Sequence, residues 1–72
     1  MSPEELGRAV RAERKRQGLR QAELAALSGV GNRFVSDLEN GKPSVEFGRA
    51  FQVLTMLGMT LDLRRRAWRD LE

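Results

Sequence analysis

The chain has 72 residues, enough for one small domain with a modest hydrophobic core. Its composition, 40% hydrophobic and 32% charged with two prolines, is typical of a folded, helix-rich chain and argues against disorder. Cysteine and histidine are both absent, which excludes disulfides and removes the commonest metal ligand, so we expect no metal and no cofactor.

The charge is unevenly placed along the chain. The net charge is only +3, but six Arg or Lys residues crowd residues 8–20 beside a single Glu, and three arginines occupy 64–66. Basic stripes suggest a polyanion as partner, and a solvated helix face is the simpler alternative. No apolar run reaches the ~20 residues that span a bilayer, and the N-terminus lacks the layout of a signal peptide. We therefore expect a cytoplasmic protein with no membrane partner.

The first predicted helix begins near the N-terminus. Ser2 can cap it, Pro3 suits the first helical position, and Glu5 completes an S-x-x-E capping box. Gly18 is placed to end the helix. One face of this helix carries, at helical spacing, Leu6, Ala9, Val10 and Arg14.

Two short helices are predicted next, over about 21–27 and 32–39. Gly29 and Gly31 interrupt a good helix-forming sequence between them, each at a cost of roughly 1 kcal/mol relative to Ala, which indicates that the break is useful. Gly29 can take a positive φ without a Cβ clash. The pattern predicts a helix-turn-helix whose second helix projects from the body, with a helical hairpin of a structural bundle as the alternative. The inward candidates are Leu24, Ala25, Leu27, Val35 and Leu38.

A fourth helix is predicted up to Gly58, which can end it. Ser44 is the expected N-cap, and Glu46 complements the positive end of the helix dipole. The apolar positions at helical spacing are Phe47, Ala50, Phe51, Leu54 and Leu57.

The period of the sequence changes after Gly58. An alternation of apolar and polar residues predicts a strand made of Met59, Thr60, Leu61, Asp62 and Leu63. A strand needs a partner, and since the chain offers no second one, we expect it to pair with the same strand of another copy. The chain is therefore divided into a helix-turn-helix domain, 1–58, and a C-terminal strand and tail for dimerisation or partner contact, 59–72.

The stretch "GLRQAELAALSGVGNRFVSDLENGK" resembles the Xre/Cro/CI class of phage-repressor-type domains, and the resemblance extends over residues 5–58. The following "PSVEFGRAFQVLTMLGMTLDLRRR" is similar to the HipB-like antitoxins. The resemblance implies an all-α, compact four- to five-helix domain with a short C-terminal strand paired across a dimer. It also implies sequence-specific binding of double-stranded DNA, regulation of the protein's own operon and, as a partner, a HipA-like kinase toxin.

Four residues of the second helix of the motif are the candidates for base contact, because the start of that helix enters the major groove. Asn32 can pair bidentately with adenine and Arg33 with guanine. One turn later, Ser36 suits a base edge or a phosphate. Asp37 can hold the guanidinium of Arg33 or accept from cytosine, which makes it a specificity element.

Phosphate contacts are expected from the helix ends, at Arg20, Gln21, Asn40 and Lys42. The family usually has Thr where this chain has Arg20. The arginine provides no N-cap and places a cation at the positive end of a helix, and a nearby phosphate would reverse that unfavourable balance.

The resemblance also implies a partly buried salt bridge between Arg14 and Glu39, which excludes Arg14 from the DNA contacts. Phe34 departs from the small or polar residues common at its position. Two roles are open for it: covering the turn, or touching a thymine methyl group.

The sequence thus predicts a dimeric repressor of a palindromic operator, the antitoxin of a HipB-like pair. Two alternatives stay open: an ordinary phage-type repressor without a toxin, and a protein-interaction module that sequesters a partner through Trp68 and Leu71. These two residues could instead pack on the domain's own core. Catalysis is rejected because the serines have no histidine to activate them.

Overall fold

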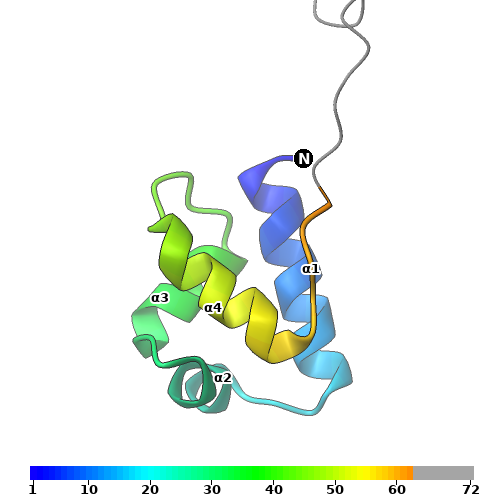
Figure 1. The fold of residues 1–72 in the computed structure, drawn as a ribbon, viewed down its shortest axis with the longest axis vertical. Helices are drawn as coiled ribbons and strands as arrows, with labels where there is room; N and C mark the ends of the chain where they lie inside the picture. Colours follow the sequence, from blue (N-terminus) through cyan, green and yellow to red (C-terminus); the bar gives the residue numbers. More distant parts are fainter. Residues whose placement is uncertain (63–72) are drawn as a thin grey trace, which may run out of the picture.

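The computed structural model describes residues 1–62, which form an all-α domain (Figure 1). The predictions for Leu63, Trp68 and Leu71 lie outside these residues. The four helices, in chain order, are α1 (Pro3–Arg16), α2 (Gln21–Ser28), α3 (Asn32–Glu39) and α4 (Phe47–Leu57). The predicted all-α, four-helix class is confirmed.

The start of α1 follows its sequence signals. The backbone N–H of Glu5 donates to Ser2 Oγ at 3.1 Å, and the N–H of Ser2 donates to Glu5 Oε1 at 3.1 Å. This reciprocal capping box satisfies two donors that a helix N-terminus leaves unpaired, and Pro3 occupies the first turn. Local chemistry alone therefore defines where this helix begins.

Gly7 allows α1 to lie directly against the end of α3. A Cβ atom at this position would lie 2.5 Å from the carbonyl oxygen of Leu38 and 2.6 Å from that of Glu39. Both neighbours are backbone atoms, which cannot rotate away. Glycine is therefore required at this position inside a helix, a role that the sequence analysis missed.

The core lies between the four helices and is small, as the chain length predicts. Leu24, Val10, Val35 and Val53 are its largest fully buried side chains. The remaining buried apolar residues are Ala25, Leu38, Ala50, Leu54 and Leu57. Each helix thus contributes one apolar stripe, as expected for a small helical domain.

One predicted inward residue, Leu27, is wrong, and two apolar positions of α4 lie outside the core. Leu27 is 54% exposed, because Leu24, Ala25 and Ser28 define the inner face of α2 and Leu27 lies roughly 100° from its centre. Phe47 and Phe51 are 66% and 44% exposed on a flank of α4. The inner face of that helix takes Val53 in their place, so the stripe has the same period but a different phase.

The predicted N-cap of α4 is also wrong. Ser44 lies in a turn before the helix, and Glu46 is the N-cap. Its carboxylate accepts the backbone N–H groups of Gly48 and Arg49, each at 3.0 Å. A carboxylate satisfies two donors and meets the positive end of the helix dipole, whereas a hydroxyl would carry no charge.

The described part of the predicted strand, Met59–Asp62, is extended chain without strand pairing among residues 1–62. Gly58, with φ of 75°, ends α4, and the chain then runs back beside α1 toward the N-terminus (Figure 1). Met59 and Leu61 pack against the core, while Thr60 and Asp62 are exposed. The alternation of the sequence is present, and pairing between two copies stays a prediction.

Candidate nucleic-acid interface

The turn between α2 and α3 has the geometry of a helix-turn-helix. Gly29 ends α2 in the left-handed region, with φ of 73°, and its N–H donates to Ala26 O at 3.4 Å. The N–H of Val30 donates to Ala25 O at 3.0 Å. A residue with a Cβ atom would be strained at Gly29, which explains the glycine that interrupts the helical pattern.

The first turn of α3 projects into solvent. Asn32 is exposed, and the side chain of Arg33 is 91% exposed. Ser36 and Asp37, one turn later on the same side, are half-buried. The four predicted base-contact residues therefore lie on one outward face of one helix, with the two strongest hydrogen-bond donors at its N-terminal end.

Asp37 lies between two cations on this face. One carboxylate oxygen, Oδ2, is 3.6 Å from Lys42 Nζ and 4.0 Å from Arg33 Nε. Ion pairs this exposed contribute little to stability, so they orient the two side chains without fixing them. The predicted role of Asp37 in holding Arg33 thus has a geometric basis, and Lys42 is a second cation that Asp37 can orient.

The predicted phosphate contacts come from two elements that meet at one end of α3. The side-chain amide of Gln21 donates to Glu39 Oε1 at 3.1 Å, which places the start of α2 beside the end of α3. Three exposed residues flank these two helix ends: Arg20 just before α2, and Asn40 and Lys42 just after α3. The structure therefore brings donors from both helices toward a common edge.

Arg20 is the N-cap of α2 and makes no side-chain cap bond, because guanidinium has no acceptor atom. Only half of a capping box forms, in which Arg20 N–H donates to Glu23 Oε1 at 2.8 Å. The departure from Thr noted in the sequence thus leaves the helix under-capped and the guanidinium in solvent.

A buried junction lies behind α3. Arg14 Nε and Nη2 donate to Glu39 Oε2 and Oε1, at 2.6 and 3.0 Å, and the exposed fractions of the two side chains are 9% and 2%. Arg14 Nη1 also donates to the carbonyl oxygen of Leu19 at 2.8 Å. The hydrogen bonds from Arg14 to Glu39 raise the pKa of the guanidinium. The predicted pair is present, and it joins α1, the loop before α2, and α3.

Gln21 belongs to this junction, which the sequence analysis did not foresee. Its side-chain amide is held by Glu39, so the phosphate contact predicted at Gln21 would have to come from its backbone N–H, a donor in the first turn of α2. The only trace of this contact in the sequence is that Gln21 stands four positions before the buried Ala25. That spacing is too common to identify a hydrogen bond to Glu39. Phe34 is half-buried and packs against the core.

Residues 1–62 lack two other features. They contain no cluster of three or more His, Cys, Asp or Glu residues that could hold a metal ion. No helix within this part of the chain is long and apolar enough to cross a membrane.

Comparison with known proteins agrees with the geometry. Residues 10–63 match the family model described as helix-turn-helix. The chain is 50% identical over 62 residues to the uncharacterized HTH-type transcriptional regulator y4mF of Sinorhizobium fredii, a match that covers 86% of this chain and 82% of that protein.

Two solved structures are also similar. A chain of the HipA-HipB-O2-O3 complex matches with a TM-score of 0.83 at 27% identity, covering 93% of this chain and 94% of that one. A chain of the HipB-O4 20mer complex matches with a TM-score of 0.82 at 27% identity and the same coverage of both chains. The helical arrangement described above is therefore found in HipB.

Proposed function

Because the chain belongs to the helix-turn-helix family of transcriptional regulators, which bind DNA and are not enzymes, we propose that it represses its own operon as the antitoxin of a HipB-like pair. The membership confirms the resemblance indicated by residues 5–58. The observation that carries the proposal is the exposed first turn of α3, held outward by the glycine turn at Gly29.

Base readout falls to the outward face of α3. Arg33 can donate two hydrogen bonds to guanine, and Asn32 can pair with adenine through its amide. Asp37 limits the directions in which Arg33 can reach, since its carboxylate lies 4.0 Å from the guanidinium nitrogen. Asp37 also repels phosphate, so it contributes to the choice of sequence and not to general affinity.

Phosphate contacts position this helix in the groove. Arg20, the backbone N–H of Gln21, Asn40 and Lys42 supply donors from the start of α2 and the end of α3. Each neutralised phosphate releases counterions, so affinity for DNA should fall steeply as salt is added. These contacts set affinity and register, while α3 sets sequence preference.

Two copies of the chain would read a palindrome. Pairing through Met59–Leu63 would join the copies and place their α3 helices about 34 Å apart, one turn of DNA. The half-site spacing of the operator is thus a geometric prediction of the dimer.

The similarity to HipB in a complex that contains both HipA and O2-O3 supports a second partner, a HipA-like toxin. Trp68 and Leu71 are proposed to contact it, because tryptophan is a favoured anchor at interfaces. A chain ending at residue 62 should then lose the toxin in a pull-down.

The test measures, by fluorescence anisotropy, how tightly the full chain binds the DNA upstream of its own gene. Arg33→Ala should lower affinity by about 1–3 kcal/mol and relax preference at one base pair in each half-site. Arg49→Ala is the matched control, since Arg49 is an exposed arginine on α4. Equal losses for the two variants would show that α3 does not read the bases.

A further inference from the structure

Some basic side chains of the domain have no carboxylate partner. Residues 1–62 contain nine Arg and Lys residues, and five of them form ion pairs: Arg14, Arg16, Arg33, Lys42 and Arg49. The four that form no ion pair within this part of the chain are all exposed: Arg8, Arg11, Lys15 and Arg20. Arg20 is already among the proposed phosphate contacts, whereas the other three all lie on α1.

These three residues form a row along α1. Residues at positions i, i+3 and i+7 of an α-helix are neighbours on one side of it, which is the spacing of Arg8, Arg11 and Lys15. We call this row the α1 basic flank. Like charges at these spacings repel each other and destabilise a helix, and no carboxylate of residues 1–62 pairs with them to offset the cost. Such a row indicates an anionic partner outside the domain.

Contacts with α3 define the side of α1 on which the flank lies. Arg11 stands four residues after Gly7 and three before Arg14. Both of those residues meet the end of α3, Gly7 by close approach to its carbonyl oxygens and Arg14 through its buried ion pair. The other flank of α1 faces α4, because Gln17 Nε2 donates to Leu57 O at 2.9 Å. The α1 basic flank therefore adjoins α3 and not α4.

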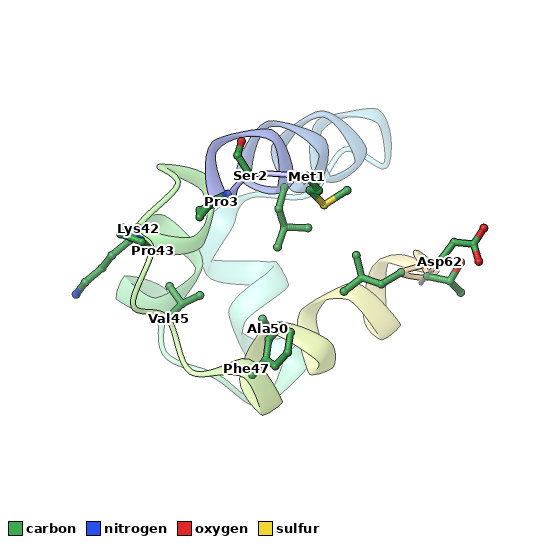
Figure 2. Close-up of a pocket in the computed structure, with 12 residues that line it drawn as sticks. Met1, Ser2, Pro3, Lys42, Pro43, Val45, Phe47, Ala50 and Asp62 are labelled. Carbon is green, nitrogen blue, oxygen red and sulfur yellow. The ribbon is translucent and has the colours of Figure 1, made fainter. Parts of the chain in front are cut away.

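Each end of the flank meets an element that is proposed to contact phosphate. At its start, a Cβ atom at Gly41 would lie 2.9 Å from the Cα atom of Glu4, so the loop after α3 lies against the first turn of α1. Figure 2 shows the side chain of Lys42 extending from this loop, away from the helices. At the other end, residues 17–20 lead from α1 to Arg20, the N-cap of α2 (Figure 1). The flank thus connects two groups of proposed phosphate contacts.

We infer that the α1 basic flank binds the phosphate backbone of double-stranded DNA beside the half-site that α3 reads. Its three cations extend over ~10.5 Å of the helix, and one strand of DNA carries a charge every ~3.4 Å of its axis, so about three phosphates match them. Arginine suits this ligand, because its guanidinium can donate to two phosphate oxygens at once. Backbone contacts read no base, so the flank adds affinity and register and leaves sequence preference to α3.

An acidic protein surface is a poorer occupant of the flank. The exposed residues beside the row, Glu4 and Ala12, provide no aromatic or large apolar side chain of the kind that anchors protein interfaces. Continuity with the proposed phosphate contacts favours DNA instead. The inference rests on the DNA binding proposed above, which it extends from α2 and α3 to a third helix.

The experiment measures the affinity of the full chain for the DNA upstream of its own gene, and for a duplex of random sequence, at several salt concentrations. Each phosphate contact contributes about 0.9 to the slope of log K against log salt, so Arg11→Gln with Lys15→Gln should flatten the slope by about 1.8 on both duplexes. A fourfold rise in salt should then weaken binding by the variant roughly 12-fold less than binding by the parent chain. The preference for the upstream DNA should not change.

The matched control is the double variant Arg16→Gln with Arg49→Gln. It removes the same number of charges from two exposed arginines that lie outside the flank, one of them on the same helix, so it should change the slope far less. Far-UV circular dichroism verifies that both double variants keep their helices. Equal changes of slope in the flank variant and the control would overturn the inference, because net charge alone would then explain them.

The outcomes also separate this inference from the proposed function. If the flank variant keeps the slope of the parent chain while Lys42→Ala flattens it, the DNA-binding function stands and the role of the flank is refuted. If the flank variant keeps that slope but no longer retains a co-expressed toxin in a pull-down, the flank belongs to a protein interface and the inference is again overturned. A parent chain that binds neither duplex would refute both.

Discussion

The two faces of α3 use carboxylates in opposite ways. On the inner face, Glu39 is 2% exposed at its side chain and accepts three hydrogen bonds, two from Arg14 and one from Gln21. On the outer face, Asp37 is 29% exposed and its two cations lie at 3.6 and 4.0 Å.

The difference follows from two roles: the inner face fixes the position of α3, and the outer face is proposed to bind DNA. In the buried junction, low polarity makes the charge pair strong and allows one geometry, so the direction in which α3 leaves the domain is fixed. On the outer face, water weakens the pairs, so Arg33 and Lys42 can exchange a carboxylate for DNA. The buried junction therefore fixes the position of α3, while the donors on its outer face can change partner.

The largest expected effect comes from breaking the junction. Glu39→Ala leaves the guanidinium of Arg14 buried without its charge partner, and we expect a loss of about 3 kcal/mol or more in the free energy of unfolding. Urea denaturation measures it. The double variant Arg14→Met with Glu39→Leu removes both charges and should recover much of the loss. A single variant as stable as the parent would mean that the junction does not hold α3.

The second effect tests the contact of α1 with the end of α3. Gly7→Ala should improve helix propensity by ~1 kcal/mol, but its Cβ would meet backbone oxygens at 2.5 and 2.6 Å. Overpacking of this kind costs ~1–3 kcal/mol, so we expect a net loss of stability. Gly48→Ala is the control, because the nearest atom there is a side-chain oxygen, Oε1 of Glu46 at 3.0 Å, and not a backbone atom. Thermal melts that rank Gly7→Ala above the parent would refute the close contact.

The third effect concerns the outer face alone. Lys42→Ala should weaken binding to every DNA sequence by a similar factor and reduce the salt slope by about one unit, since one phosphate contact is lost. Stability should hardly change, because its pair with Asp37 is exposed. Binding isotherms at several salt concentrations measure the affinity for DNA and its salt slope. A change in sequence preference with an unaltered slope would instead make Lys42 a base reader.

The smallest effect tests a conflict between the stability of the free domain and DNA binding. Arg20→Thr would supply the missing N-cap of α2 and should stabilise the free domain by ~1 kcal/mol. It should also weaken DNA binding, because the variant loses a cation that is proposed to contact a phosphate. Unfolding and binding are measured on the same preparation. Tighter binding by this variant would contradict the assignment of Arg20 to a phosphate.

Prediction from the sequence succeeded where the signal was local. The capping box at Ser2 and Glu5 and the glycine turn at Gly29 depend on neighbours within four residues, and both formed as predicted. Which edge of the apolar stripe of α4 is buried was not predicted, because Phe47 and Phe51 fit the helical period as well as Val53 does. Periodicity defines a stripe, and only packing decides which edge of it turns inward.

The exposure of the first turn of α3 could be predicted because the start of a recognition helix must be polar and exposed, and base contact by its residues stays a prediction. The membership of Gln21 in the buried junction could not, since its partner Glu39 lies 18 residues away.

The sequence by itself determined the helices, the turn and the family, because hydrogen bonds between near neighbours and the period of apolar residues are written along the chain. Only the tertiary structure decided which glycine must lack a side chain and which carboxylate is buried. It also decided that the row of cations on α1 adjoins α3. These features depend on atoms that are distant in sequence, so their distances exist only once the helices have packed.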